Sequence, residues 1–317
     1  MKTINLCFRV HQRYNLKRYR FFEIGNDHYY YDDYANESAM AAAVEQSYLE
    51  ANRMLLDMIK SSNGRFRVSF SISGLALEQF QQYAPEVIES FQELAKTGSV
   101  EFLATPYGHS LAALYNDDEF ELQVKMQADK IQELFGKRPT VFANSGLLFS
   151  DEIADKVYRM GYKTIMIEDA KHVMGWKSSH YVYSSIANPK AKLLVRDSKL
   201  SDDINYRFSQ WGWCEYPLTA EKFINWVNAS PAEEEVFNIF LGYEALGQLN
   251  SRESGIFEFF KALPYHAIEK VSHSPLHQKL SKLSNLSMLY RLSIQCRGPM
   301  RKKTSALGVA TTSKTRL

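Results

Sequence analysis

Residues 4–10 read INLCFRV, and the stretch at 39–61 that follows carries a different periodicity. The first is rich in β-branched and aromatic residues, which is typical of a strand. The second places apolar residues such as Met40, Leu55 and Ile59 at helical spacing. A strand followed by an amphipathic helix starts an alternation that decides the fold class.

The alternation of strand and helix continues along most of the chain. Further strands are predicted at residues 66–72, 100–104, 140–143, 163–167, 193–196 and 235–241. Helices are predicted between them at 85–97, 117–135, 151–160, 220–228 and 255–263. Strands separated by helices pair in parallel through right-handed crossovers, and about seven of them favour a barrel. We expect an α/β fold, an incomplete (β/α)7 TIM-like barrel with helical excursions.

The sequence predicts two regions, a barrel domain at 1–270 and a tail at 271–317. The tail has little periodicity, no acidic residue and a basic end. Its composition is typical of a solvated or disordered segment.

Composition excludes several classes of protein. The formal net charge of +2 argues against a nucleic-acid or anionic-membrane partner, and no run approaches the roughly 20 apolar residues of a membrane span. The cysteines, Cys7, Cys214 and Cys296, have no CxxC spacing, so neither a disulfide framework nor a zinc site is indicated. No apolar core of a signal peptide follows Met1. We expect a cytoplasmic protein without a metal or cofactor.

Several short motifs occur in a characteristic order. The first is VHQRY at 10–14. It is followed by RYRFFEIGNDH at 18–28, SFSISG at 69–74, YAPEVI at 83–88, VEFLA at 100–104, AKHVMGW at 170–176, LSDDI at 200–204 and GIFEF at 255–259. This series resembles the α-amylase branch of glycoside hydrolase family 57, although Arg13 replaces the proline of the family's HQPY motif. The resemblance implies an incomplete (β/α) barrel followed by a helical region, and action on α-glucan chains with retention of configuration.

The resemblance also implies where two catalytic carboxylates should lie, and both positions hold glycine. A retaining glycosidase needs a nucleophile and a general acid/base. The stretch ANSGLLFSDEI at 143–153 matches the family's nucleophile region with Gly146 at the glutamate position. The stretch GYEALGQL at 242–249 matches its acid/base region with Gly242 at the aspartate position. Glycine can neither attack an anomeric carbon nor protonate a leaving oxygen, so we predict a pseudoenzyme with no catalytic residue.

Neighbouring acidic residues leave an alternative open. Glu244 lies two residues beyond Gly242, and along a strand such residues share a face, so its carboxylate could replace the missing one. The family also has this glutamate beside its aspartate, which favours an orienting role. Asp151 and Glu152 open a predicted helix, where acids interact with the positive end of the dipole.

Four residues are candidates for contact with a sugar: His11, His109, Trp213 and Glu244. His11 follows the first strand, where it could donate to a hydroxyl or serve as a structural histidine. Trp213 lies in QWGWCEYP at 210–217, similar to a family stretch, and could stack on a sugar ring. Trp176 also lies in a family-like stretch, where a packing role is equally plausible.

These residues predict an α-glucan or maltooligosaccharide ligand and a binding or regulatory role, including association with an active amylase. Two alternatives remain, an active hydrolase or transferase that uses other carboxylates and a decaying gene product. The second is suggested by the tail. If the codons of residues 296–308 are shifted by one base, they can be read as VPWADEEKDVSAW, which resembles the start of the family's helical region. We therefore expect a frameshift that truncated or altered this region near or before Gln295.

Overall fold

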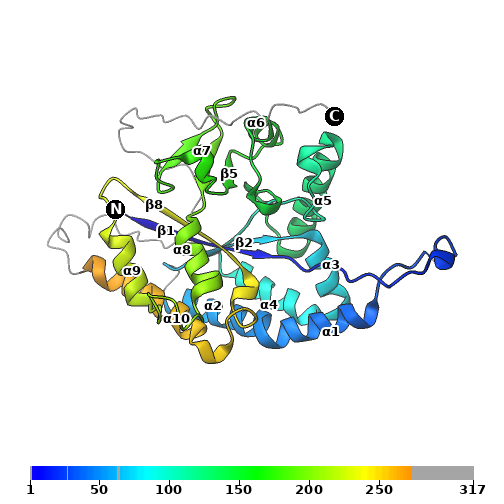
Figure 1. Cartoon of the computed structure of the whole chain (residues 1–317), viewed down its shortest axis with the longest axis horizontal. Helices are drawn as coiled ribbons and strands as arrows, with labels where there is room; N and C mark the ends of the chain where they lie inside the picture. The colour runs from blue at the N-terminus through cyan, green and yellow to red at the C-terminus, as the bar shows by residue number, and fades with distance from the viewer. Residues whose placement is uncertain (1, 27, 63–64, 273–317) are drawn as a thin grey trace.

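The computed structural model describes residues 2–26, 28–62 and 65–272, in which strands and helices alternate (Figure 1). The strands are β1 (Thr3–Val10), β2 (Val68–Ile72), β3 (Val100–Phe102), β4 (Val141–Ala143), β5 (Thr164–Ile167), β6 (Val182–Ser184), β7 (Lys192–Val195) and β8 (Val236–Gly242). The helices are α1 (Asp33–Ala43), α2 (Leu49–Ser61), α3 (Gly74–Tyr83), α4 (Pro85–Lys96), α5 (Asp117–Phe135), α6 (Asp151–Arg159), α7 (Lys171–Met174), α8 (Ser198–Asp202), α9 (Ala220–Ala229) and α10 (Ile256–Ser272). The α/β prediction is confirmed.

Seven of these strands form a parallel ring. Hydrogen bonds join them into two sheets, β3-β2-β1-β8 and β4-β5-β7-β6. Single parallel bridges connect the sheets, one between Ala104 and Phe142 and one between Arg196 and Asn238. β6 is the exception, because it pairs antiparallel with β7. The ring is therefore barrel-like, with only a single bridge at each of the two seams between the sheets. This agrees with the predicted incomplete (β/α)7 barrel.

Side chains of β1 alternate between the inside of the ring and the surrounding helices. Leu6 and Phe8 pack in the outer core with residues of α2, α3, α4, α9 and α10. Cys7 instead packs inside the ring with residues such as Leu194 and Phe240. Asn5 also points inward, where its amide nitrogen donates to Asn238 Oδ1 at 2.5 Å. This alternation carries Arg9 to the inner side at the carboxyl end of the strand.

Local sequence signals explain where several helices begin. The side chains of Ser73, Asn116, Ser150 and Thr219 each accept a hydrogen bond from a backbone N–H in the first turn of the helix that follows. Pro85 occupies the first turn of α4, where its missing N–H costs nothing. These caps fix the points at which the chain leaves the strand ends.

Several parts of the chain differ from the predicted elements. The single helix expected at 39–61 is divided into α1 and α2 by a π-helical turn at Val44–Tyr48. The pattern missed α3, α7, α8 and β6, which are short or only partly apolar. Of the predicted tail, residues 273–317 lie outside the described residues.

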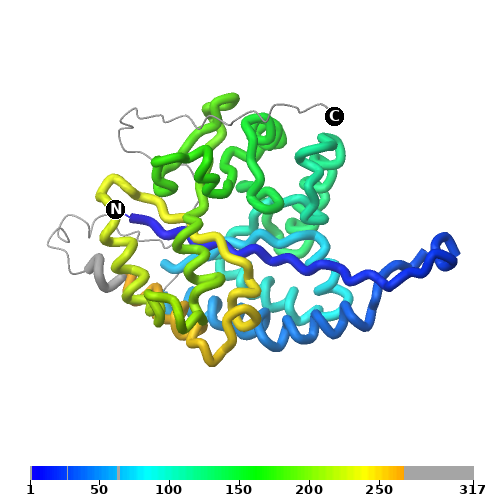
Figure 2. The backbone as a smooth tube through the Cα atoms, in the orientation of Figure 1, coloured from blue at the N-terminus to red at the C-terminus, as the bar shows by residue number. Residues whose placement is uncertain are grey.

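Residues 15–26 and 28–32 leave the barrel as an extended hairpin. Figure 2 shows this segment projecting from the body directly after β1. Leu16 pairs antiparallel with Tyr31 at its base, and the rings of Phe21 and Phe22 near its tip are 81% and 85% exposed. Among the described residues, no helix is both long and apolar enough to cross a membrane.

Candidate functional site

Five polar side chains meet at the carboxyl ends of the strands, where the sites of such barrels lie. We call Arg9, His11, Ser73, His109 and Glu244 the barrel mouth. The imidazole rings of His11 and His109 stack with centroids 4.5 Å apart, and His11 Nδ1 lies 2.9 Å from Ser73 Oγ. Arg9 Nη2 donates to Glu244 Oε1 at 2.5 Å. The mouth brings together three of the four sugar-contact candidates.

A glycine contact positions the loop that carries His109. The ring of Tyr107 lies against Gly74, where an added Cβ would come within 2.2 Å of it. Tyr107 is held there by its hydroxyl, which donates to Glu78 at 2.6 Å. His109 itself adopts a left-handed backbone conformation with φ of 52°. Gly74 is therefore a structural requirement for the placement of His109.

The pKa values of both histidines of the mouth are lowered. Burial lowers the pKa of His11, and the charge of Arg9 lowers it further. Burial also lowers the pKa of His109 to about 4, with contributions from His11 and Arg9 that the carboxylate of Glu244 only partly offsets. Both rings are therefore neutral near pH 7, and each can donate one hydrogen bond and accept another.

The carboxylate of Glu244 occupies the space where a side chain at position 242 would begin. A Cβ added to Gly242 would lie 2.3 Å from Glu244 Oε1 and 2.4 Å from its carboxyl carbon. The predicted reason for this placement was wrong, because β8 ends at Gly242 and Tyr243–Ala245 form a 3-10 turn rather than a strand. The turn, together with Arg9, directs Glu244 back over the glycine.

Gly146 has no comparable neighbour. It lies in a 3-10 turn after β4, at φ of 60°, and a Cβ added there would meet only Leu148 Cγ, at 4.0 Å. The following residue, Leu147, is also left-handed, with φ of 53°. The loop therefore presents backbone rather than a carboxylate to the ring.

Other acidic side chains near the strand ends are already engaged. Glu168 follows β5 and accepts a hydrogen bond from Arg196 Nη1 at 3.0 Å, while Arg196 Nη2 donates to Asp202 at 2.5 Å. Asp151 and Glu152 lie in the first turn of α6, as predicted, and Asp151 accepts from the Ser185 hydroxyl. These contacts give Glu168, Asp202 and Asp151 structural partners.

The two candidate tryptophans lie elsewhere. Trp213 is half-buried against the outer core, and its ring is 6.3 Å from that of Trp226 on α9. No contact between Trp213 and the mouth is found within the described ranges. Trp176 is 94% exposed, which does not fit a packing role. Trp211, which the sequence reasoning did not single out, is 83% exposed and stacks on Tyr216.

Two members of the mouth, Arg9 and Ser73, were also missed. A signal for Arg9 existed, because a charged residue inside a strand that is buried on both faces needs a partner. Ser73 could have been recognised as a helix cap, since its hydroxyl also accepts from Ala76 N at 3.2 Å. The partners of both residues come from distant parts of the chain.

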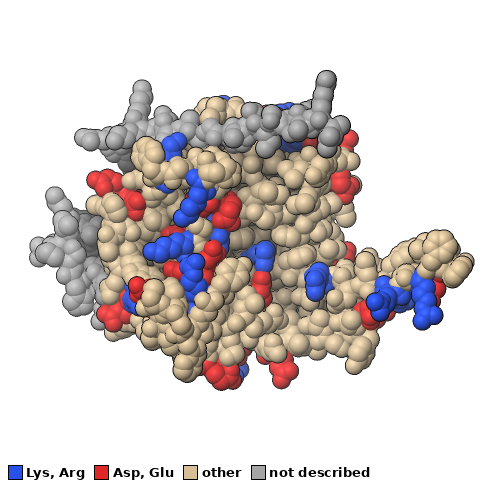
Figure 3. Space-filling view, viewed as in Figure 1, with Lys and Arg blue, Asp and Glu red and all other residues tan. Residues whose placement is uncertain are grey.

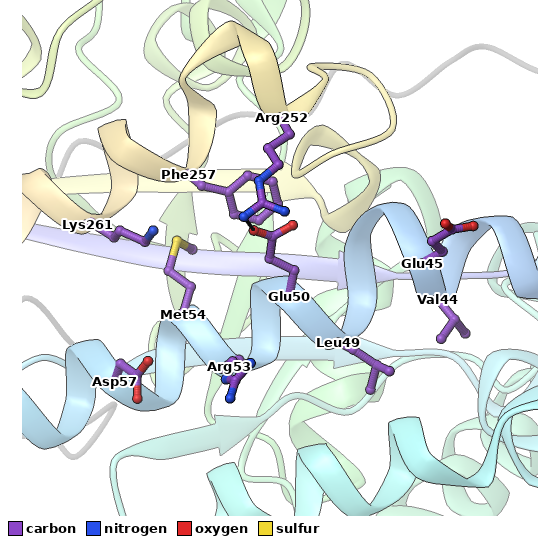
Figure 4. A pocket seen from close by; sticks show the side chains of 10 residues that line it. All are labelled: Val44, Glu45, Leu49, Glu50, Arg53, Met54, Asp57, Arg252, Phe257 and Lys261. Carbon is purple, nitrogen blue, oxygen red and sulfur yellow. Dashed lines mark ion pairs between the residues drawn. The ribbon is translucent and has the colours of Figure 1, made fainter.

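One cavity of the structure lies away from the barrel mouth. A cavity of about 530 Å³ lies between α2 and α10, where Arg252 Nη2 and Glu50 Oε1 form an ion pair at 3.1 Å (Figure 4). None of the five mouth residues lines it. In the described part of the chain, no three His, Cys, Asp or Glu side chains are grouped to hold a metal ion.

Comparison with known proteins identifies the family. The model of Glycosyl hydrolase family 57 matches residues 5–291. A protein of Methanocaldococcus jannaschii that is named as a candidate α-amylase is 36% identical over 276 residues, which cover 86% of this chain and 57% of the relative. The chain thus spans little more than half the length of that protein.

Solved structures agree on the fold. The 4-α-glucanotransferase of Thermococcus litoralis superposes with a TM-score of 0.62 at 16% identity, over 89% of this chain and 38% of that one. A family 57 branching enzyme of Thermococcus kodakaraensis, solved with glucose, gives a TM-score of 0.59 at 10% identity, over 89% and 71% of the two chains. With the family match and the seven-stranded parallel ring, they lead to one conclusion: this chain belongs to glycosyl hydrolase family 57, a family of α-amylase-like carbohydrate enzymes.

Proposed function

We propose that this protein binds α-glucan or maltooligosaccharide at the barrel mouth without hydrolysing it. The observation that carries the proposal is the pair of glycines at positions 146 and 242 together with the placement of Glu244. Retaining glycosidases need two carboxyl groups about 5–5.5 Å apart, one to attack and one to transfer protons. Here Gly146 presents no side chain, and Glu244 is tied to Arg9.

The mouth retains groups suited to sugar hydroxyls. The neutral imidazole of His109 offers a donor and an acceptor, while His11, whose Nδ1 is engaged by Ser73 Oγ, offers its Nε2. Arg9 and Glu244 provide charged partners whose side chains are 37% and 31% exposed, so part of each remains accessible. A binding or regulatory role in carbohydrate metabolism uses these groups without covalent chemistry. This role includes association with an active amylase. We propose neither a nucleic acid nor a membrane as a partner.

Isothermal titration with maltooligosaccharides of increasing length tests the binding proposal. We expect saturable binding to the purified protein and at least a tenfold loss of affinity in a His11→Ala, His109→Ala double variant, because two hydrogen-bonded contacts are removed. His172→Ala, at an exposed position on α7, is the matched control and should leave affinity unchanged. Absence of saturation in the wild-type protein would reject the proposal.

An active hydrolase or transferase is the second candidate, favoured by the position of the Glu244 carboxylate over Gly242. The structure offers a way to separate the two functions. In a Gly146→Glu, Gly242→Asp double variant, the new aspartate forces Glu244 away from its present position, since their atoms would otherwise overlap. If Glu244 is a substitute acid, this variant and a Glu244→Gln variant alter turnover in opposite directions.

The domain organisation belongs to the same proposal. We infer that residues 1–270 form the barrel domain and that a frameshift changed the region after it. Reading the coding DNA in all three frames tests this inference, which fails if the shifted frame contains stop codons within codons 296–308. Normal cellular abundance and a cooperative melting transition would count against a decaying gene product.

We also infer a cytoplasmic location. Cys7 and Cys214 are free thiols, the first buried inside the ring and the second exposed, which suits a reducing compartment. Cell fractionation followed by immunodetection tests this, and recovery in a secreted fraction would contradict it.

A further inference from the structure

A second cavity lies outside the ring, beside the seam where β7 approaches β8. Its volume is about 300 Å³, and it is lined by α7, the segment before β6, α8, the end of α9 and the start of β8. We call it the seam cavity. The residues that matter for its chemistry are Lys171, Ser179, His180, Asp197, Lys199 and Trp226.

The acidic groups of the seam cavity already have partners. Asp197 Oδ2 lies 2.7 Å from His180 Nε2, and Asp197 Oδ1 accepts from Leu200 N at 2.8 Å. Asp169 Oδ2 accepts from the Ser198 hydroxyl at 2.8 Å. These carboxylates are thus fixed by the protein itself and do not call for an external cation.

Two lysines of the seam cavity contribute positive charge to its wall. Lys171 and Lys199 line the seam cavity, and neither forms an ion pair with any residue that the structure describes. Figure 3 shows basic and acidic side chains gathered on the face of the molecule that carries α8. The lining has three lysines, Lys171, Lys177 and Lys199, against two carboxylates, Asp169 and Asp197, so its charge balance is positive and favours an anion.

Size and wall chemistry restrict the anion further. A volume of about 300 Å³ is at the lower end for small-molecule sites, which suits a monosaccharide-sized compound. Trp226, Phe237 and Leu200 give the cavity an apolar wall, while the hydroxyl of Ser179 is available as a polar contact. An aromatic wall beside cationic groups suits a sugar ring that carries a phosphate.

Trp176 adds an independent observation. Its indole is 94% exposed, although large aromatic side chains are normally among the most buried. Its chain neighbours Gly175 and Lys177 both line the seam cavity, so Trp176 belongs to the segment that borders it. A ligand in the cavity would give this side chain a surface to cover.

We propose that the seam cavity is a binding site for a small sugar phosphate, with Lys171 and Lys199 at the phosphate and Trp226 beside the sugar ring. This site is separate from the barrel mouth and does not depend on glucan binding there.

Calorimetric titration of the full chain with glucose 1-phosphate, inorganic phosphate and glucose tests the proposal. We expect glucose 1-phosphate to bind most tightly, with affinity that falls as salt is added, and to change the tryptophan fluorescence. A Lys171→Gln, Lys199→Gln double variant should lose affinity by about tenfold or more, because charged hydrogen bonds are removed. A Lys96→Gln, Lys125→Gln variant, changed at two other exposed lysines, is the matched control.

Four outcomes would overturn the proposal. No heat with either phosphate compound would show that the site binds no phosphate. Equal affinity for glucose and glucose 1-phosphate would show that the lysines do not recognise the phosphate. Equal affinity for inorganic phosphate and glucose 1-phosphate would show that the site does not recognise the sugar. Equal losses in the two lysine variants would place the binding elsewhere. Circular dichroism of both variants confirms that each is folded.

Discussion

The barrel mouth and the seam between β7 and β8 both contain partly buried histidines, yet the pKa values of these rings move in opposite directions. At the mouth, burial and nearby positive charge lower the pKa values of His11 and His109. At the seam, burial also lowers the pKa of His180, but hydrogen bonds to Asp197 and Glu234 outweigh it and raise the pKa above its ordinary value. Carboxylate partners, rather than burial, decide the charge.

This contrast bears on function. The seam has kept a pair of carboxylates around its histidine, with His180 Nδ1 2.6 Å from Glu234 Oε2 and Nε2 2.7 Å from Asp197 Oδ2. The mouth, where the family resemblance implies two carboxylates, has glycine at both positions. Charged groups thus hold the barrel together at the seam, while the mouth contains mainly neutral hydrogen-bonding groups.

The largest predicted effect comes from breaking the seam. Asp197→Asn removes the charge facing His180 but keeps an oxygen that can cap α8. Because it leaves a buried histidine with one carboxylate fewer, we expect the free energy of unfolding to fall by about 3 kcal/mol, measured by denaturant titration. Glu258→Gln, in an exposed ion pair on α10, is the control and should remain close to the wild-type protein. Equal losses would contradict the role of the seam.

A smaller effect is expected at the mouth from Gly74→Ala. The new methyl group would overlap the Tyr107 ring, so the loop that carries His109 must shift. We expect about 1–3 kcal/mol of destabilisation and weaker maltooligosaccharide binding. Gly212→Ala is the matched control, because a Cβ there meets nothing within 4 Å. Unchanged binding in Gly74→Ala would separate Tyr107 from the placement of His109.

The smallest effects are pH-dependent and have opposite signs. The pKa of His109 is lowered, so its contribution to stability is present above the unfolded pKa of about 6.5 and is lost as the pH falls toward 4. The pKa of His180 is raised, so its contribution is present below about 6.5 and is lost as the pH rises through the folded value.

Unfolding of single variants between pH 4 and 8 separates these two contributions. His109→Gln should flatten the acid side of the stability profile, and His180→Gln should flatten the side above pH 6.5. Titration of the ring protons by NMR provides a second measurement. If both variants change the same side of the profile, the opposite pKa shifts are wrong.

Much of the fold could be predicted from local sequence. The predicted helix at 117–135 coincides with α5, because its cap, Asn116, and its terminating glycine, Gly136, are both local signals. All seven strands of the ring were also expected, because their runs of β-branched and aromatic residues are local signals too. Closure of the ring through single bridges at Ala104 and Arg196 was not expected, since pairing between distant segments leaves little trace in local periodicity.

The site was predictable in part. His11, His109 and Glu244 follow strands or lie in family-like stretches, and the structure brings them together. The contact between Glu244 and Arg9 depends on a turn that ends β8, which the two-residue spacing did not reveal. Trp213 resembles a family residue, but its position beside Trp226 follows from packing against α9.

The most direct test of the central claim is the release of reducing ends from soluble starch by the purified full chain. We predict no release above that of buffer, and no difference between the wild-type protein and a Glu244→Gln variant. Sustained release by the wild-type protein that is lost in Glu244→Gln would contradict the claim, because it would show that a carboxylate at the mouth still performs the chemistry.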